Sequence, residues 1–433
     1  MTELLSVEAA KERAILVAIA LPGQKGATEK SLTELQRLTE TAGAEVLDLI
    51  LQSRPQIDKS LYLGKGKLQL LKLTCEELKA DLVIFDDELT PSQQKAIQRQ
   101  IKSVKIMDRS SLILYIFKQH AKTREAKTQV ELATLEYELP RLTRQWTHLE
   151  RQVGGINVRG GMGETQIEID RRLIRQRIKK LKEELEKISV QRDTQRKFRD
   201  QRYNVSLVGY TNAGKSTLMN QLTEAGVLVK DKLFATLDTT VRQVQLDKQH
   251  TIYLSDTVGF IQKLPHQLVA SFRSTLQETA AADLLLKIID ISDGDFRLHI
   301  KTINETLANF EIPSKRYISI FNKTDIIPDG VNISLIKKEF PDAIFISAAR
   351  GIGLDKIIEI IIQRMDSDAI NRHIRVQNSD GKLIAQLHQF GKNIQVEKCD
   401  DWIDFRLRLD EELWNRLKKE YVFEDLSAKG KEN

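Results

Sequence analysis

Cysteine is nearly absent from the sequence, which contains only Cys75 and Cys399 among 433 residues. Two cysteines are too few for a disulfide framework and lack the spacing of a metal site, so we expect a reducing compartment. Proline is also scarce, at 8 residues, and 41% of the chain is apolar, which indicates that most of it folds. No apolar run is long: "AILVAIALP" at 14–22 is far shorter than the about 18 residues that a membrane span requires. We recognise no targeting sequence, so we expect a cytoplasmic protein without a membrane span.

What the sequence does contain is an alternation of strand and helix patterns over residues 1–120. Short β-branched runs such as "AILVAIAL" and "DLVIFDD" alternate with helical patterns such as "LTELQRLTETAG". Strands separated by helices predict βαβ units and a mainly parallel sheet, so residues 1–120 are predicted to form an α/β domain. The segment "GKGK" at 64–67 lacks the spacing and the Ser or Thr of a phosphate loop, and we interpret it as the start of a helix.

Residues 121–200 are charged, and their apolar residues recur at heptad spacing. One set is Leu132, Leu135, Leu139, Leu142, Trp146 and Leu149, and the other is Ile174, Ile178, Leu181, Leu185 and Ile188. This spacing predicts a hairpin of two helices, in which Pro140 either kinks the first helix or marks its start. Between them, the glycines of "GGINVRGGMGETQ" at 154–166 indicate a flexible tip. From Arg171 to Arg202 basic residues clearly outnumber acidic ones, which fits a phosphate-binding face or a solvated helix.

The segment "NVSLVGYTNAGKST" places a phosphate-binding motif between a strand and a helix. In this motif, Gly209 and Gly214 let backbone amides surround phosphates, Lys215 supplies charge to the β- and γ-phosphates, and Ser216 can ligate Mg²⁺. We therefore predict an α/β multidomain protein with a P-loop domain at 201–366 and a small C-terminal α/β domain at 370–433. The predicted nucleotide contacts of the loop are Gly209, Tyr210, Thr211, Asn212, Ala213, Gly214, Lys215, Ser216 and Thr217.

The segment "FNKTD" at 321–325 predicts that the base is guanine. Asp325 can accept hydrogen bonds from guanine N1–H and N2–H₂, whereas adenine offers no matching pair of donors. The segment "SAARG" at 347–351 also follows a strand pattern, and it fits a backbone contact to guanine O6. The predicted base site comprises Asn322, Lys323, Thr324, Asp325, Ser347, Ala348 and Ala349.

Two further segments predict how Mg²⁺ and the γ-phosphate are held. In "LSDTVGF", Asp256 ends a strand and can hold Mg²⁺ through water, and the amide of Gly259 can contact the γ-phosphate. In "FATLDTTVRQV", Thr236, Thr239 and Thr240 are candidate ligands of Mg²⁺. The predicted nucleotide contacts here are Phe234, Ala235, Thr236, Leu237, Asp238, Asp256, Thr257, Val258 and Gly259. The candidate catalytic residues are Lys215, Thr236 and Gly259.

Phe260 directly follows Gly259, at the position where many small GTPases carry a glutamine that orients the attacking water. An apolar ring cannot orient water, so we expect slow intrinsic turnover and a partner, metal ion or inserted group that completes the site. An alternative interpretation is that Phe260 packs against apolar neighbours such as Ile261 and Leu264, and both interpretations can hold together.

The segments "GYTNAGKST", "FATLD", "DTVGFI", "NKTD" and "SA", preceded by "LPRLTRQWTHLERQVGG" and "GETQIEIDRR", closely resemble the HflX family of ribosome-associated GTPases. The resemblance covers about residues 10–365, and "WTHLERQ" and "GETQ" are more specific than the GTPase motifs. It implies an N-terminal α/β domain, a helical hairpin, a GTPase domain and, in some members, a C-terminal domain. It also implies that Thr236 of "FATLD" ligates Mg²⁺. The segment "RGGMGETQ" is slightly longer than the "RGxGETQ" expected for the family. Because of this difference, the tip contacts of the family do not transfer residue by residue to this chain.

The resemblance implies a GTP hydrolase that binds the large ribosomal subunit and its rRNA, is stimulated by ribosomes, and splits or rescues stalled ribosomes under stress. Candidate rRNA contacts are Arg159, Arg171 and Arg172. The loop asparagine Asn212 resembles that of potassium-activated GTPases, which implies K⁺ beside Mg²⁺. We expect a monomer that binds GTP and GDP. Two alternatives are an RNA-binding or remodelling module with GTP as a conformational ligand, and a ribosome-assembly factor.

Overall fold

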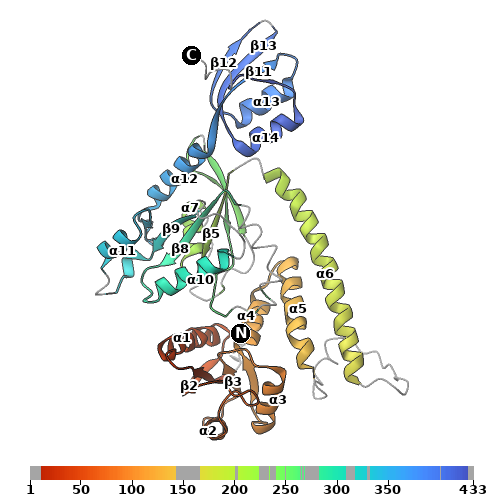
Figure 1. The fold of residues 1–433 in the computed structure, drawn as a ribbon, viewed down its shortest axis with the longest axis vertical. Coiled ribbons are helices and arrows are strands. Elements are labelled where there is room, and N and C mark those ends of the chain that lie inside the picture. The colour runs from red at the N-terminus through yellow and green to blue at the C-terminus, as the bar shows by residue number, and fades with distance from the viewer. Residues whose placement is uncertain are drawn as a thin grey trace, which may run out of the picture.

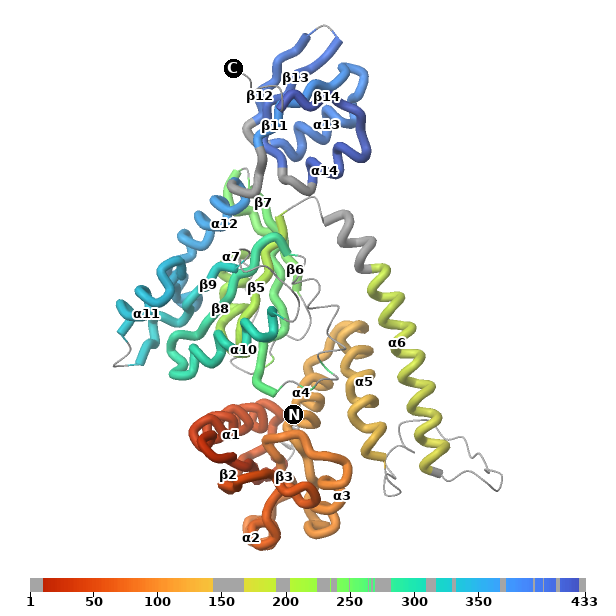
Figure 2. The backbone as a smooth tube through the Cα atoms, viewed as in Figure 1, coloured from red at the N-terminus to blue at the C-terminus, as the bar shows by residue number. Residues whose placement is uncertain are grey.

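The computed structural model describes residues 11–142, 166–199, 203–223, 234, 240–248, 250–263, 265, 268, 282–308, 317–328, 332–399 and 401–427. These residues form three β-sheets, which follow one another along the long axis of the molecule in chain order (Figure 1). The backbone trace in Figure 2 shows the same succession, with the N-terminal unit at one end and the C-terminal unit at the other. The predicted α/β multidomain fold is confirmed. None of the helices within the described ranges is long and apolar enough to cross a membrane.

The first sheet is parallel, with the strand order β2-β1-β3-β4. Its unit comprises β1 Arg13–Ala20, α1 Lys25–Thr41, β2 Glu45–Ser53, α2 Lys65–Glu77, β3 Leu82–Phe85, α3 Pro91–Gln100, β4 Lys105–Asp108 and α4 Arg109–His120. Side chains of β1 point alternately to the two faces, so Leu16 packs under α1 and α4 while Val17 packs under α2 and α3. Gly64 is the N-cap of α2, which confirms that "GKGK" begins a helix.

The helical hairpin consists of α5 Arg124–Glu138 and α6 Gln166–Arg199. The helices run antiparallel, because Arg124 pairs with Glu184 and Glu131 pairs with Arg177. Leu132, Ile174 and Leu181 of the predicted stripes are buried. In Figure 1, α6 extends from the level of the first sheet to the base of the third.

Pro140 ends the first helix of the hairpin. It lies in the 3₁₀ turn η1 Leu139–Arg141, directly after the last residue of α5. The alternative that Pro140 marks the start of this helix is wrong, because α5 begins at Arg124, whereas the expected interruption at Pro140 is confirmed. The physical reason is that proline has no N–H to donate and its ring clashes with the preceding turn. Trp146, Leu149 and the glycine-rich tip up to residue 165 lie outside the described residues.

The second sheet has the strand order β10-β9-β8-β5-β7-β6, and all neighbouring strands except β6 and β7 are parallel. Its unit comprises β5 Tyr203–Gly209, α7 Lys215–Thr223, β6 Thr240–Gln245, β7 Thr251–Asp256, β8 Leu284–Asp290, α10 Phe296–Ala308, β9 Tyr317–Asn322, η4 Thr324–Ile326, α11 Ile333–Glu339, β10 Ile344–Phe345 and α12 Leu354–Asp368. Helices α7 and α12 pack on one face through Leu218 and Ile361, whereas α10 packs on the other through Ile303. The motif segments follow the carboxyl ends of the parallel strands, where open α/β sheets bind ligands.

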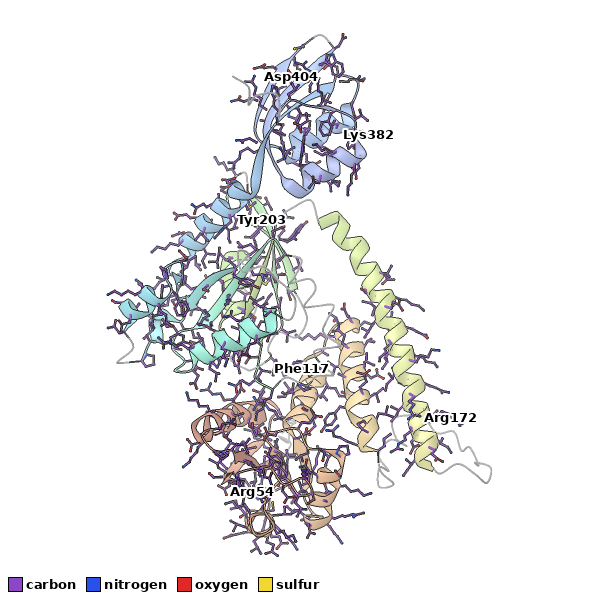
Figure 3. The ribbon with its side chains drawn as sticks, in the orientation of Figure 1. Arg54, Phe117, Arg172, Tyr203, Lys382 and Asp404 are labelled. Carbon is purple, nitrogen blue, oxygen red and sulfur yellow. The ribbon has the colours of Figure 1, made fainter. Side chains whose placement is uncertain are left out.

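The third sheet is antiparallel, with the strand order β12-β13-β11-β14. Its unit comprises β11 Ala369–Gln377, α13 Gly381–Phe390, β12 Lys392–Lys398, β13 Trp402–Asp410, α14 Glu411–Glu420 and β14 Glu424–Asp425. Its core contains Leu383 of α13 and Trp414 of α14, packed against Phe405 of β13. On β13, Asp404 pairs with Arg375 of β11 through two hydrogen bonds of 2.7 Å (Figure 3).

The first two units share one continuous apolar core. Phe117 of α4 meets Phe234 in an edge-to-face contact, with ring centroids 4.6 Å apart. Figure 3 shows Phe117 between the first sheet and the second. The same core includes Tyr210 and Phe260, which belong to the motif segments of the second unit. The N-terminal unit therefore packs directly against the region in which the nucleotide motifs lie.

Candidate functional site

The phosphate-loop motif connects β5 to α7, and two of its glycines are required by their surroundings. A Cβ atom at Gly209 would lie 2.4 Å from the carbonyl oxygen of Ile288 on the neighbouring strand. Gly214 has a φ of +91°, and a Cβ atom there would lie 2.2 Å from Nδ2 of Asn322. Glycine is the residue that can adopt this backbone geometry at such close approach. The loop is thereby held tightly against the ends of β8 and β9.

Lys215 is buried at the first position of α7. Its ammonium donates to the carbonyl oxygens of Gly209 at 3.2 Å and Tyr210 at 2.9 Å. Burial lowers the pKa of Lys215 to about 8, while the charge of Asp256 acts in the opposite direction. The charged form of a buried ammonium whose hydrogen bonds go mainly to neutral carbonyls would be stabilised by a nearby phosphate anion.

Ser216 and Asp256 come together although they lie on different elements. The Ser216 hydroxyl donates to Asp256 Oδ2 at 2.6 Å, which joins the start of α7 to the end of β7. Hydroxyl and carboxylate oxygens are the ligands that Mg²⁺ prefers, so this pair fits a magnesium site. Thr236, the third predicted ligand, lies outside the described residues, as do Ala235, Leu237, Asp238 and Thr239.

Asn322 connects the phosphate loop to the loop that follows β10. Its Nδ2 donates to the carbonyl oxygen of Ala213 at 2.9 Å, and its Oδ1 accepts from the amide of Ala348 at 2.9 Å. Asn322 is almost fully buried, so these bonds are protected from water. The structure therefore places the side chain of Asn322 as the brace of both loops.

Asp325 lies beside Asn322 and is held by neighbouring side chains. Its Oδ1 accepts from the Ser347 hydroxyl at 2.6 Å, and Arg350 lies 3.4 Å from Oδ2. The hydrogen bond from Ser347 is the main reason why the pKa of Asp325 lies below its usual value, and the charge of Arg350 adds to it. Asp325 is therefore an anion at neutral pH that can accept hydrogen bonds. Lys323 pairs with Asp290 at 2.7 Å, at the end of β8.

Gly259 packs tightly against the phosphate loop. A Cβ atom at this position would lie 2.8 Å from Cα and Cγ2 of Thr211 and 3.0 Å from Nζ of Lys215. The next residue, Phe260, donates its amide to the carbonyl oxygen of Gly209 at 3.0 Å and accepts from the amide of Thr211 at 2.8 Å. The Phe260 ring is buried in the core shared with Ile261, which confirms the packing interpretation of this residue.

Tyr210 joins the phosphate loop to the N-terminal unit. Its hydroxyl donates to Glu34 of α1 and accepts from the backbone amide of Gln262 at 2.9 Å. Its ring stacks on His299 of α10, with centroids 3.8 Å apart. Burial, followed by the charge of Glu34, raises the pKa of Tyr210 well above its ordinary value. One side chain therefore contacts three elements that surround the motif.

A second connection runs through Lys263, whose ammonium lies 2.5 Å from carboxylate oxygens of both Asp86 and Asp87. Asp86 is fully buried and also pairs with Arg109 at 2.8 Å. No motif predicted these residues or Glu34. The signal available in the sequence was the pair of aspartates that ends "DLVIFDD", because polar groups at the carboxyl end of a buried parallel strand often serve a site.

The remaining predicted residues are distributed as follows. Phe234 is buried against Phe117, and Asn212 is exposed with a left-handed φ of 61°. Thr257 donates from its hydroxyl to the carbonyl oxygen of Leu207 at 2.8 Å. On α6, Arg171 is half-buried and Arg172 is exposed (Figure 3), whereas Arg159 lies outside the described residues.

Comparisons with known families cover most of the chain. Residues 29–118 match a family described as GTP-binding GTPase N-terminal, and residues 120–199 match one described as GTP-binding GTPase Middle Region. Residues 204–323 match a family described as 50S ribosome-binding GTPase. The matched ranges cover the first unit from within α1 onward, the hairpin and most of the second sheet.

Several full-length relatives carry the name GTPase HflX. The protein of Caldanaerobacter subterraneus subsp. tengcongensis is 47% identical over 413 residues, which is 94% of this chain and 93% of the relative. That of Magnetococcus marinus is 40% identical over 422 residues, covering 96% and 97% of the two chains. That of Escherichia coli K12 is 38% identical over 416 residues, covering 95% and 96%. The similarity therefore extends through the C-terminal unit.

Proposed function

Because this chain belongs to the HflX family of GTPases, we propose that it binds the large ribosomal subunit and uses GTP to split or rescue stalled ribosomes under stress. GTP hydrolysis is the activity of the family, and the chain contains the P-loop domain that this activity requires. The observation that most directly supports a ribosomal partner is the match of residues 204–323 to a family described as 50S ribosome-binding GTPase. We further propose that the protein acts as a cytoplasmic monomer.

GTP and GDP are proposed to lie along the phosphate loop, with the base at Asp325. The backbone amides of residues 210–216 and the ammonium of Lys215 would hold the phosphates, because both donate toward anions. The two carboxylate oxygens of Asp325 would accept from guanine N1–H and N2–H₂, and the loop at 347–349 would contact O6. Support comes from Asn322, whose two hydrogen bonds fix the phosphate loop and the base loop relative to each other.

Mg²⁺ is proposed to be held by Ser216, by Asp256 through water, and by Thr236, the last on the strength of family resemblance. When bound, the ion neutralises charge that develops on the phosphate oxygens. We also propose that K⁺ is held near the phosphates by the side chain of Asn212. Hydrolysis rates in KCl and NaCl at equal ionic strength test this point, and equal rates would contradict it.

The catalytic cycle is proposed to operate through Gly259. Its amide would contact the γ-phosphate. The segment that follows contacts the N-terminal unit directly through Lys263. It also contacts that unit indirectly through Gln262, whose amide donates to the Tyr210 hydroxyl that in turn donates to Glu34. A displacement at Gly259 would therefore alter contacts with Glu34 and Asp86, which lie on a different α/β unit. Hydrolysis would remove the γ-phosphate and reset these contacts.

Helix α6 supports RNA as the partner that the N-terminal half contacts. It has 34 residues and is rich in Arg and Lys, including the exposed Arg172, and such side chains can neutralise RNA phosphates. We place rRNA contacts at Arg171 and Arg172, and at Arg159 in the tip. The same helix favours the alternative of an RNA-binding or remodelling module in which GTP is only a conformational ligand. A third alternative is a ribosome-assembly factor. Accumulation of ribosomal precursor particles after deletion of the gene would favour it.

The direct test is a subunit-splitting assay. Purified 70S ribosomes are mixed with the full-length protein, and dissociation is followed by light scattering with GTP, a non-hydrolysable GTP analogue or GDP. We expect splitting with GTP and little with GDP, and we expect Lys215→Ala to be inactive because it cannot hold the β- and γ-phosphates. If Lys215→Ala binds RNA and splits ribosomes as well as the natural protein does, nucleotide is incidental and the RNA-module alternative is favoured.

A further inference from the structure

The chain needs a polar group near the γ-phosphate that Phe260 cannot supply. Hydrolysis requires that a water molecule be oriented for attack on the γ-phosphorus. The Phe260 side chain is only 3% exposed and packs in the core with Tyr210 and Ile261. It is therefore neither polar nor placed to reach a reacting water, so a residue of this chain that orients the water would be another polar residue near the phosphate loop.

Thr211 has a hydroxyl group without a partner at this place. The residue is 7% exposed, and its Oγ1 has no hydrogen-bond partner within the described part of the chain. Buried hydroxyls in native proteins are almost always paired, because an unpaired one loses the hydrogen bonds it made in water. An orphaned hydroxyl in a phosphate loop therefore calls for a functional explanation.

The position of Thr211 relative to the catalytic candidates points to the γ-phosphate. Its Cα and Cγ2 lie only 2.8 Å from where a Cβ atom of Gly259 would be, and Nζ of Lys215 lies 3.0 Å from that same point. Its amide also donates to the carbonyl oxygen of Phe260 at 2.8 Å. Thr211 is thus packed against Gly259, close to the point that Nζ of Lys215 also approaches.

Thr211 also lines a cavity of about 150 Å³. The cavity lies between the phosphate loop, α1 and α10, and its polar lining includes Asn212, Gln262 and Arg37. A water molecule in the liquid occupies about 30 Å³ and needs two to four polar partners, so this space is large and polar enough to admit water. Water could therefore reach the side of the loop on which Thr211 lies.

We propose that Thr211 is a catalytic residue whose hydroxyl accepts a hydrogen bond from the attacking water and donates a hydrogen bond to a γ-phosphate oxygen. The water oxygen forms a bond to the γ-phosphorus while the bond between that phosphorus and the β,γ-bridging oxygen breaks. The electron pair of the broken bond stays on the bridging oxygen, which leaves with GDP. One proton of the water passes to the inorganic phosphate that forms, and Thr211 keeps its own proton throughout. This assignment rests on the nucleotide site proposed above, and it is independent of the ribosome.

The test compares variants that separate the hydroxyl from the shape of the side chain. Thr211→Val keeps the branched shape and removes the hydroxyl, whereas Thr211→Ser keeps the hydroxyl. In single-turnover GTP hydrolysis by the full-length protein, we expect Thr211→Val to be slower by about 10²-fold, the usual cost of removing one transition-state hydrogen bond. Thr211→Ser should stay within about 3-fold of the natural protein on the same reasoning.

A matched control is Thr128→Val on α5. Thr128 is 6% exposed, as buried as Thr211, and its hydroxyl donates to the carbonyl oxygen of Arg124 at 2.8 Å, outside the nucleotide site. This variant should hydrolyse GTP at the natural rate. If Thr211→Val does not fold, Thr211→Ala serves as the second variant without a hydroxyl.

Binding of GDP, with and without aluminium fluoride, distinguishes a catalytic role of Thr211 from a purely structural one. We expect Thr211→Val to bind GDP with natural affinity, and to bind GDP with aluminium fluoride more weakly, because only the latter mimics the transition state. Natural hydrolysis rates in Thr211→Val would overturn the proposal, and so would equal losses in Thr211→Val and Thr211→Ser. Neither result bears on stimulation by ribosomes. If the natural protein itself fails to bind GDP, the proposed nucleotide site is wrong, which is a different outcome from a failure of the Thr211 proposal.

Discussion

At the scale of single residues, the site depends on side-chain hydrogen bonds that join different elements. Asn322 joins the phosphate loop to Ala348, and Ser216 joins α7 to Asp256. Each of these bonds connects segments that are far apart in the sequence, so each residue fixes the geometry of two loops at once. A substitution at such a position is expected to change nucleotide binding even where it leaves the fold intact.

Asp325 offers the sharpest test of base recognition. Asp325→Asn keeps Oδ1, which accepts from Ser347 at 2.6 Å, and replaces the second acceptor by an amide donor. We expect the affinity for GTP to fall by at least about 10²-fold, because the guanine N2–H₂ group would face a donor. Xanthosine triphosphate, which carries a carbonyl at C2, should bind the variant better than GTP does. Competition against a fluorescent GDP analogue measures both affinities, and an unchanged preference for GTP would remove Asp325 from the base site.

The candidate residues of the phosphate loop could be named from the sequence because motif chemistry is local. Gly209, Gly214 and Lys215 lie within one short loop, and the requirements of a phosphate fix their order and spacing. The contacts of Tyr210 could not be predicted in the same way. Its hydroxyl meets Glu34, which is distant in the sequence, and no local pattern encodes a contact between two separately folded units.

At the scale of elements, the hairpin shows both the strength and the limit of pattern reading. The apolar periodicity placed Ile174 and Leu181 correctly on the buried face of α6. The interruption at Pro140 was also predicted, but the start of the helix was not: α5 begins at Arg124 and ends directly before η1 Leu139–Arg141. Hydrophobic spacing reports which face is buried, whereas the helix end is set by the missing N–H of proline.

The packing of α6 on α5 can be tested with two leucines of the same helix. Leu181 is 1% exposed and Leu173 is 48% exposed. Leu181→Ala should lower the free energy of opening of the hairpin by about 2–5 kcal/mol, because it leaves a cavity in a packed interface. Leu173→Ala should change it by no more than about 0.5 kcal/mol. Hydrogen exchange of the α5 and α6 amides measures both, and equal effects of the two substitutions would show that the stripe is not the buried face.

At the scale of the whole molecule, the N-terminal unit is coupled to the nucleotide unit by apolar packing and by charge. Phe117 packs on Phe234, and Lys263 reaches Asp86 across the same interface. Burial alone would raise the pKa of Asp86, but the charges of Arg109 and Lys263, with hydrogen bonds from Lys263 and Ser31, lower it below its ordinary value. The interface therefore contains a buried carboxylate that is stabilised as an anion.

This lowered pKa predicts how stability depends on pH. The contribution of Asp86 is fully present above its unfolded pKa of 3.8 and is lost as the pH falls through the lower folded pKa. The urea midpoint of the natural protein should therefore fall more steeply between about pH 5 and pH 2 than that of Asp86→Asn. The control is Asp342→Asn, which removes an exposed carboxylate and whose urea midpoint should follow that of the natural protein. Parallel acid profiles for the natural protein and Asp86→Asn would contradict the coupling.

If the ribosome completes the nucleotide site, large ribosomal subunits should raise the rate of GTP hydrolysis, and this rate can be measured directly. The full-length protein is assayed alone and with purified large ribosomal subunits, with Lys215→Ala as the blank. We predict slow hydrolysis by the protein alone and stimulation by about 10³-fold or more with the subunits, the range over which a partner can complete such a site. A rate that does not change with large subunits, in a protein that binds GTP tightly, would contradict the account.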